Sequence, residues 1–258
     1  MEFPQLDSGL IVQVPVSLRI QKRMDVNRFR DGSVIKNTNS SQSQYTWNCK
    51  YVNLSDHELL RFEEFWHSTG RGAATFTFVD PLGNMLRDTE NVLASSWTKS
   101  GTTEITEAAS TGQYKEYLLT NSGTIASVVS QVIDVSPQFS VLFSCLAKWV
   151  STTAISLVSS DDSGSIRKSF TISGESYCGL KIAGGLQSAV RTFGIEVPPQ
   201  SQVIVSELQV EIALGRGTYV PSAAGGVFHK AWIEPYDFTI KTEAPGAHSI
   251  NLIVHCER

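Results

Sequence analysis

The sequence predicts a mainly β protein built from two domains, one of which is discontinuous. One helical pattern stands among alternating strands at the start of the chain, a Ser-, Thr-, Val- and Gly-rich stretch of short β segments fills the middle, and alternating strands return at the end. We therefore expect a small α+β domain, a β-sheet with one helix, at residues 1–86 and 226–258. A β-sandwich or jelly roll at residues 87–225 is expected to be inserted into it.

The helix is predicted over residues 55–70. Ser55 and Glu58 have the spacing of a capping box, in which each side chain bonds the backbone amide of the other residue. Gly70 suits the left-handed residue that ends many helices. The apolar residues that recur at helical spacing are Leu59, Phe62, Phe65 and Trp66. One face of this helix is therefore expected to pack on a sheet.

The strands around the helix are predicted from their alternation. Residues 10–30 are rich in β-branched side chains and end at Asp31-Gly32, a hairpin turn signal. Residues 36–44 are entirely polar or basic, so we expect a loop there. The cleanest alternation covers residues 45–51, with the aromatic residues and Cys49 on one face.

The strands predicted at the end of the chain are the reason that we expect the first domain to be discontinuous. Alternating strands are expected at 236–240 and 249–255, separated by the turn signal Pro245-Gly246. Two strands do not make a stable unit alone, so they need a sheet to join. The sheet begun before residue 86 is the natural host, and insertion at an exposed turn is tolerated when its ends lie close.

The middle of the chain fits no helical pattern. Short β segments are predicted at 103–107, 116–120, 128–133, 139–148, 154–158, 166–172, 190–196 and 203–212. Turn signals such as Asp161-Asp-Ser-Gly164 separate them. Regular short strands with turns between them are typical of a sandwich or jelly roll.

Composition excludes several classes of function. The chain of 258 residues is 41% hydrophobic and 18% charged, which is typical of a folded protein. Its net charge is −4, and none of the segments 1–85, 86–225 and 226–258 has a basic excess, so general nucleic-acid binding is not expected. No apolar run reaches membrane-spanning length, and no signal peptide precedes the first strand. We expect the protein to be made in a cytosol and not to insert into a membrane.

Two sets of motifs resemble proteins of tailed bacteriophages. Phe3-Pro-Gln-Leu6, Val26-Asn-Arg-Phe-Arg-Asp-Gly32, the helix with Phe62-Glu-Glu-Phe-Trp66, and Phe76-Thr-Phe-Val-Asp-Pro81 follow one another in that order. This order resembles the distal tail or tail-tip hub proteins of long-tailed, siphovirus-like phages, over roughly residues 1–85 and 228–258. The resemblance implies a virion protein that forms a ring, by analogy a hexamer, and links the tail tube to the tip or baseplate.

The second set lies in the middle of the chain. Asn91-Val-Leu-Ala-Ser-Ser-Trp97-Thr-Lys-Ser-Gly101 opens it, and Gln209-Val-Glu211, Gly215 and Tyr219-Val-Pro-Ser222 close it. This resembles the jelly-roll domains, similar to carbohydrate-binding modules, of phage tail and fibre proteins. The closing motif departs from the family pattern in its spacing, and Ser222 replaces the usual Thr. The resemblance implies a jelly roll more firmly than it implies sugar binding.

Catalytic and metal-binding patterns are absent from the sequence. The five histidines form no zinc motif, and no Gly-rich segment has the context of a phosphate loop, so no cofactor and no metal are expected. The four cysteines have no CxxC spacing, and we expect buried reduced thiols. Asp161-Asp162 is interpreted as a hairpin turn. Glu207 and Glu211, at even spacing, could share one strand face.

Exposed aromatic residues are the expected means of sugar binding, because sugar faces stack on rings. Tyr177 is predicted in a turn, Trp149 ends an apolar run, and Tyr114 precedes a strand. Trp97 belongs to the opening motif and is expected in the core. The candidate glycan contacts are therefore Tyr177, Trp149 and Tyr114.

We accordingly expect a non-enzymatic tail-tip protein, assembled in the host cytoplasm, with itself, other tail proteins and a host glycan as partners. The alternatives are a glycan-binding receptor-recognition module, including a free-standing monomeric one, and a polysaccharide-degrading tail enzyme. The enzyme would have to use carboxylates such as Asp161 or Glu211.

Overall fold

The computed structural model divides into two compact units, unit 1 (residues 1–78 and 228–258) and unit 2 (residues 79–227). It describes residues 3–110, 112–151, 154–185, 188–212, 217–234 and 238–257, and at 23–25 and 37–42 the backbone alone. Within these ranges α1 is the one helix and the strands form three sheets, so the predicted mainly β fold is confirmed. None of the helical residues in these ranges forms a segment that is long and apolar enough to cross a membrane.

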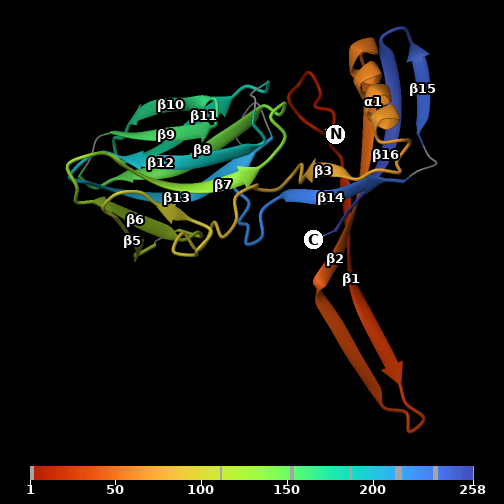
Figure 1. Ribbon diagram of the computed structural model, residues 1–258, viewed down its shortest axis with the longest axis horizontal. Coiled ribbons are helices and arrows are strands. Elements are labelled where there is room, and N and C mark those ends of the chain that lie inside the picture. Colours follow the sequence, from red (N-terminus) through yellow and green to blue (C-terminus); the bar gives the residue numbers. More distant parts are fainter. Residues whose placement is uncertain are drawn as a thin grey trace. The chain divides into compact units, whose positions relative to one another are not determined.

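Unit 1 is a six-stranded sheet with a helix on one face (Figure 1). The strand order is β1-β2-β16-β14-β3, and β15 also pairs with β16. The elements are β1 (Ser17–Arg28), β2 (Val34–Leu54), α1 (Asp56–Ser68), β3 (Phe76–Val79), β14 (Val227–Ile233), β15 (Thr239–Ala244) and β16 (Ala247–Glu257). The strands from the end of the chain thus lie in the sheet begun at its start. Tyr236 and Asp237, predicted to begin the strand at 236–240, lie outside the described residues.

The core of unit 1 is an aromatic cluster between α1 and the sheet. Phe62 and Phe65 of the helix are buried against the face that carries Trp47 and Tyr51. Phe3 lies at the centre, with its ring centroid 5.0 Å from that of Phe78 and 5.3 Å from that of Phe65. Edge-to-face contacts of this kind add to the hydrophobic gain of burial. The predicted packing of one helix face on a sheet is correct.

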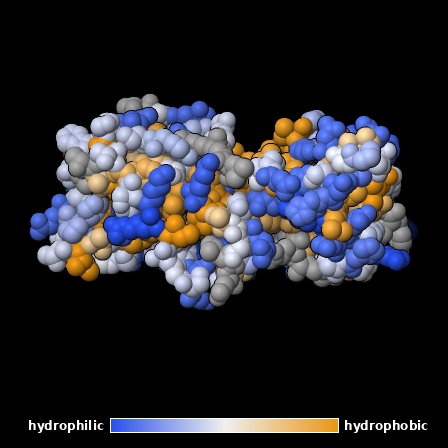
Figure 2. All heavy atoms as spheres, turned by 90° about the horizontal axis from the view of Figure 1, so that it is seen from above, coloured by the Kyte–Doolittle hydropathy of each residue, from blue (hydrophilic) through white to orange (hydrophobic). Residues whose placement is uncertain are grey.

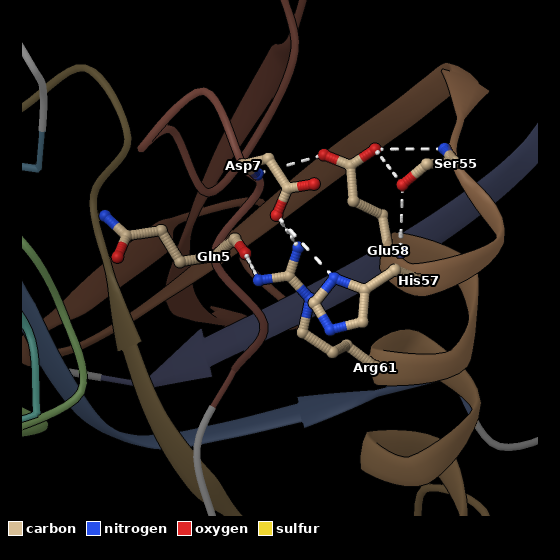
Figure 3. Close-up of polar contacts among 6 residues, drawn as sticks. All are labelled: Gln5, Asp7, Ser55, His57, Glu58 and Arg61. Carbon is tan, nitrogen blue, oxygen red and sulfur yellow. Dashed lines mark hydrogen bonds and ion pairs between the residues drawn. The ribbon is translucent and has the colours of Figure 1, made fainter.

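The predicted capping box is present and also fixes the start of the chain (Figure 3). The amide of Glu58 donates to Ser55 Oγ at 3.2 Å, and the amide of Ser55 donates to Glu58 Oε2 at 3.0 Å. Glu58 Oε1 accepts the amide of Asp7 at 3.0 Å, and Arg61 donates to the carbonyl of Gln5 at 2.7 Å. The carboxylate of Asp7 pairs with Arg61. The helix therefore holds the segment that carries Phe3 in the core.

The predicted loop at 36–44 is wrong, because β2 runs unbroken from Val34 to Leu54 and pairs with β1. The pairing shifts register between Lys22 and Met24. A two-stranded ribbon has solvent on both faces, so a polar run can extend a strand without any alternation of core residues. The predicted turn at Asp31-Gly32 is correct, with Gly32 at φ 86°. We call residues 17–36 the arm; its free end extends away from α1 in Figure 1.

Unit 2 is a sandwich of two five-stranded antiparallel sheets (Figure 1). One sheet has the order β10-β9-β12-β7-β4, and the other, which we call the E sheet, has the order β11-β8-β13-β6-β5. The strands are β4 (Thr98–Lys99), β5 (Thr103–Ala108), β6 (Glu116–Asn121), β7 (Ser127–Asp134), β8 (Val141–Trp149), β9 (Ala154–Asp161), β10 (Gly164–Thr171), β11 (Glu175–Ile182), β12 (Val190–Val197) and β13 (Ser201–Glu211).

The two sheets enclose an apolar core to which both contribute. Phe143 of β8 and Phe193 of β12 meet with ring centroids 5.8 Å apart. Trp97 is buried, as predicted, and its indole N–H donates to the carbonyl of Asp88 at 3.3 Å. All four cysteines are free and buried, which confirms the prediction for them. Cys145 and Cys178 lie directly opposite each other in the E sheet.

The segment that enters the sandwich is bound through a buried side chain. Asn84 donates to the carbonyl of Leu208 at 2.7 Å, and its oxygen accepts the amides of Leu86 and Val210, each at 3.0 Å. These bonds lie beside a β-bulge in β13, where the register shifts between Ser206 and Gln209. Bulges expose unpaired backbone groups, and Asn84 satisfies them.

Candidate functional site

Hydrophobic residues reach the surface of both units between hydrophilic ones, as the face drawn in Figure 2 shows. Tyr177 and Trp149 are among the exposed ones, at 43% and 52%. Tyr114 instead packs edge-to-face on Tyr219, with centroids 4.7 Å apart. The three predicted glycan contacts therefore have different surroundings.

Tyr177 lies within β11 and not in the predicted turn. Gly174, at φ 74°, completes the chain reversal, and Glu175 already pairs with Lys148 of β8. Side chains alternate along a strand, and Phe143 of β8 points into the core, so Leu146 points outward. Tyr177 is paired with Leu146 and shares this outer face.

Trp149 points the other way. It lies three residues beyond Leu146 on the same strand, so alternation directs it to the opposite face, at the rim of the sandwich. The structure therefore does not bring Trp149 and Tyr177 together. Of the predicted contacts, Tyr177 alone lies on the outer face of the E sheet.

The ring of Tyr177 lies along its own strand. A Cβ atom built on Gly179 would meet the Tyr177 hydroxyl at 2.8 Å and the ring at 3.2 Å, so the ring occupies the space that a side chain at this position would take. Residues two apart point to the same face of a strand. Gly179 thus leaves open the space beside the strand that the Tyr177 ring occupies.

A charged array lies beside this ring. Lys148 Nζ lies 2.6 Å from Glu116 Oε1 and 3.1 Å from Glu175 Oε2. Glu116 is nearly buried, while Glu175 is about half exposed. The hydrogen bond that Lys148 donates to Glu116, ahead of the one that it donates to Glu175, raises the pKa of Lys148 and favours its charged form. The array presents a fixed cation and an accessible carboxylate.

The next row of this face offers an amide. Gln202 Nε2 donates to Thr120 Oγ1 at 3.2 Å, and its side chain keeps a second N–H for another acceptor. Ile204 of β13 is the direct neighbour of Lys148 on one side and of Leu118 on the other. The outer face of the E sheet therefore combines one aromatic platform, a few apolar side chains and several fixed polar groups.

The other groups considered from sequence have structural roles. Asp161 Oδ1 accepts the amide of Ser163 at 2.8 Å, which confirms the predicted turn. The side-chain and backbone hydrogen bonds from Ser163 lower the pKa of Asp161. A hollow of about 210 Å³ lies at this turn and is lined mainly by serines. Within the described ranges no three His, Cys, Asp or Glu side chains gather as a metal site would need.

The expectation that Glu207 and Glu211 share a strand face is wrong. The bulge adds one residue to β13 between Ser206 and Gln209, so even spacing no longer means one face. Glu207 has φ 52°, and Glu211 accepts the amide of Gly217 at 3.0 Å. Gly215 of the closing motif lies outside the described residues.

No protein-family profile and no curated protein sequence matches the chain. Among solved structures, the enzymatically active domain of tailspike protein 4 of bacteriophage CBA120 is similar over 50% of this chain and 21% of that one, with 17% identity and a TM-score of 0.41. The chain thus spans about a fifth of that tailspike structure. Each likeness, including the two that follow, is one of fold.

Two carbohydrate-binding modules are similar to a comparable extent. A family 61 module solved with beta-1,4-galactotriose has a TM-score of 0.40 and 12% identity, over 49% of this chain and 97% of that one. The C-terminal family 22 module of Clostridium thermocellum Xyn10B has a TM-score of 0.40 and 14% identity, over 56% and 100%.

Sequence reasoning found Tyr177 but missed its surroundings. The alternation Glu175, Tyr177, Gly179 is visible in the sequence and is typical of one strand face, but the turn predicted there overlooked it. Lys148 and Glu116 come from other strands, and no local pattern indicates which residues will face Tyr177. Register between distant strands is needed to find them.

Proposed function

We propose that unit 2 binds a glycan on the outer face of the E sheet and that unit 1 attaches the protein to a bacteriophage tail. The observation that carries the proposal is Tyr177, whose half-exposed ring occupies the space above Gly179 beside a charged array. The protein then acts by binding alone, and no bond is broken. A glycan on the host surface is the ligand that this role requires.

The chemistry of the face fits a sugar ring. One side of many sugar rings carries C–H groups, which pack on an aromatic face, and hydroxyl groups surround the edge. Glu175 can accept from hydroxyls, and Lys148 has one N–H that its two carboxylate partners leave free for a hydroxyl oxygen. Charged groups give the stronger hydrogen bonds of this kind.

The face is open and carries one exposed aromatic residue, so a single site is expected to bind weakly. Repeated copies on one particle raise the overall affinity without any new contact, because the second binding event becomes intramolecular. Weak sites are therefore compatible with stable attachment to a cell surface covered by glycans.

The proposal is tested by measuring glycan binding of the whole chain, first on an array and then by titration with the best ligand. Tyr177→Ala is expected to weaken binding about tenfold, equivalent to about 1.4 kcal/mol. Trp149→Ala is the matched control, since it removes an equally exposed aromatic side chain from the opposite face. Equal losses in both variants, or binding to no glycan, would overturn the proposal.

Assembly into a tail-tip ring is the second candidate function, and the arm favours it. Phe29 and Ile35 are each about half exposed on a ribbon of two strands, which is not stable alone in water. Exposed apolar side chains on such an element indicate a protein partner. Light scattering and negative-stain images of the purified chain test this: a ring, expected to be hexameric, supports it. A monomer at all concentrations would contradict ring assembly and favour the alternative, a glycan-binding receptor-recognition module.

A polysaccharide-degrading enzyme is the remaining alternative from sequence. Asp161 and Glu211 are its available carboxylates, and each accepts a backbone amide, that of Ser163 and that of Gly217. Incubation of the chain with bacterial polysaccharides, followed by a reducing-end assay, is expected to show no cleavage. Cleavage that Asp161→Asn or Glu211→Gln abolishes, with the fold intact, would contradict this expectation.

A further inference from the structure

Basic and acidic side chains are separated within unit 1, although the total charge of residues 1–85 does not show it. Residues 1–85 hold nine basic and nine acidic side chains. The arm alone, residues 17–36, holds six basic residues and two acidic ones, which gives a net charge of +4. Helix α1 holds four acidic residues and one basic one, a net charge of −3. One basic element and one acidic element therefore belong to the same unit.

The end of the arm combines this charge with apolar side chains. Arg28 pairs with Val34 and Val26 pairs with Lys36, so these four side chains share one face of the ribbon. All four are exposed, and the two valines are about half exposed. On this face, which we call the tip face, each of two cations thus lies opposite a valine of the other strand.

The helix offers the complementary pattern. Leu60, Glu63, Glu64 and His67 follow one another at helical spacing and form one stripe, which we call the α1 stripe. Leu60 is half exposed, and Glu64 and His67 are exposed. Arg61, the one basic residue of α1 other than histidine, is turned to Gln5 and Asp7 (Figure 3), so it does not offset these carboxylates.

The arm does not reach the helix of its own chain. β1 and β2 leave the sheet away from α1, and the free end of the arm and the helix lie at opposite ends of unit 1 (Figure 1). Any contact between the two must therefore join different copies. Since the tip face and the α1 stripe are different surfaces, the contact is head-to-tail, and repeated head-to-tail contacts close into rings or extend as filaments.

We infer that the tip face of one copy docks on the α1 stripe of a second copy of this chain. The valines pack against Leu60, and Arg28 and Lys36 lie against Glu63 and Glu64. The inference rests on the proposed assembly function and names its interface. Complementary charges of this kind set which surfaces meet and in which register.

Thiol trapping tests the contact even where assembly is weak. Val34→Cys and Leu60→Cys are prepared separately, mixed, and oxidised gently with oxidised glutathione. The disulfide between the two new cysteines forms as the S–S bond of glutathione is reduced, and the hydrogens of both thiols pass to the two glutathione thiols released. A covalent dimer with one chain of each kind is expected. The control is Leu82→Cys mixed with Val34→Cys, since Leu82 is equally exposed in unit 2. No cross-link above this control would overturn the inference.

Charge reversal distinguishes the contact from assembly in general. Arg28→Glu with Lys36→Glu, and separately Glu63→Lys with Glu64→Lys, are each expected to abolish the oligomer seen by light scattering. A mixture of the two double variants is expected to restore the oligomer at low salt, with the two variants alternating. The altered tip face matches the altered α1 stripe, and the normal tip face of the second variant matches the normal α1 stripe of the first. Lys99→Glu, an exposed change in unit 2, is the control.

The other possible outcomes also test the proposed interface. Persistent oligomers in both double variants would overturn this interface while the assembly function stands. A wild-type chain that does not assemble, together with cysteine variants that do not cross-link, would reject both the interface and the assembly function. Loss of binding to duplex DNA or anionic vesicles in the arm variant, without any cross-link between copies, would show that the arm serves an anionic surface and not a second copy.

Discussion

The carboxylate of Glu58 accepts a hydrogen bond from the backbone amide of Asp7, 51 residues earlier in the chain. With its other oxygen it accepts the amide of Ser55 and so caps α1. Burial opposes the charged form, but the hydrogen bonds from Asp7 and Ser55 outweigh it and lower the pKa of Glu58. One side chain thus ties the start of the helix to the segment that fills the core of unit 1.

Glu58→Ala is therefore expected to destabilise unit 1 by more than the loss of a helix cap alone. Caps contribute about 0.5–2 kcal/mol, and we expect about 2 kcal/mol here because the Asp7 amide also loses its partner. Glu64→Ala removes the same side chain from an exposed position of α1 and is expected to change stability by under about 0.5 kcal/mol. Urea unfolding followed by circular dichroism measures both. Equal effects would contradict the role given to Glu58.

A pair between α1 and β16 predicts how stability depends on pH. Asp56 Oδ1 lies 2.7 Å from Nε2 of His248, whose Nδ1 lies 3.0 Å from Thr242 Oγ1. The hydrogen bond with His248 is the largest cause of the lowered pKa of Asp56, below its ordinary 3.8. The unfolded chain then binds more protons than the folded one in this range, so stability rises with pH there.

The contribution of Asp56 is thus present in full above about pH 4 and is lost as pH falls through the lowered value in the folded protein. Asp56→Asn removes the titrating group. We expect the difference in melting temperature between wild type and this variant to shrink as pH is lowered from 5 to about 2.5. Asp162→Asn, an exposed change, is the control. A difference that stays constant over this range would contradict the assignment.

Asn84 makes buried hydrogen bonds that unit 2 needs where the chain enters it. Asn84→Ala leaves the carbonyl of Leu208 and the amides of Leu86 and Val210 without their buried partner. Unsatisfied buried groups cost about 1–3 kcal/mol each, so a loss of about 3 kcal/mol is expected after partial relaxation. Asn91→Ala changes the same side chain at an exposed position and is expected to be nearly neutral. Thermal unfolding of the two variants checks the difference.

Local patterns predicted the elements whose causes are local. The Ser55 and Glu58 capping box, the Gly70 helix end and the Asp31-Gly32 turn each depend on residues within a few positions, and each is present. The strand through residues 36–44 was missed because its pairing with β1, and not its own pattern, makes it a strand. Its side chains need no apolar face.

The site was predicted only in part for a related reason. Tyr177 could be identified as an exposed aromatic residue, but its strand position depends on pairing with Leu146. The bulge at Glu207 depends on contacts between β13, β8 and Asn84, which lie far apart in sequence. Charge totals over 1–85 hid the basic arm because the acidic helix of the same segment balances it.

A change at Gly179 tests whether the position of the Tyr177 ring matters for binding, because it displaces the ring without removing it. A methyl group at position 179 would lie 2.8 Å from the Tyr177 hydroxyl, so the ring must rise from the sheet. Its backbone does not have the positive φ that favours glycine, so no backbone strain is added. Gly179→Ala is therefore expected to weaken glycan binding several-fold while leaving the melting temperature within about 2 °C of wild type.

The matched control is Ser176→Ala, which changes β11 on the side that faces the core and not the platform. Its glycan affinity is expected to equal that of the wild type. Tyr177→Ala combined with Gly179→Ala is expected to bind no more weakly than Tyr177→Ala alone, since the methyl group acts only through the ring. Additive losses of affinity in the double variant would mean that Gly179 itself contacts the ligand. They would contradict the inference that Gly179 acts only by leaving space for the Tyr177 ring.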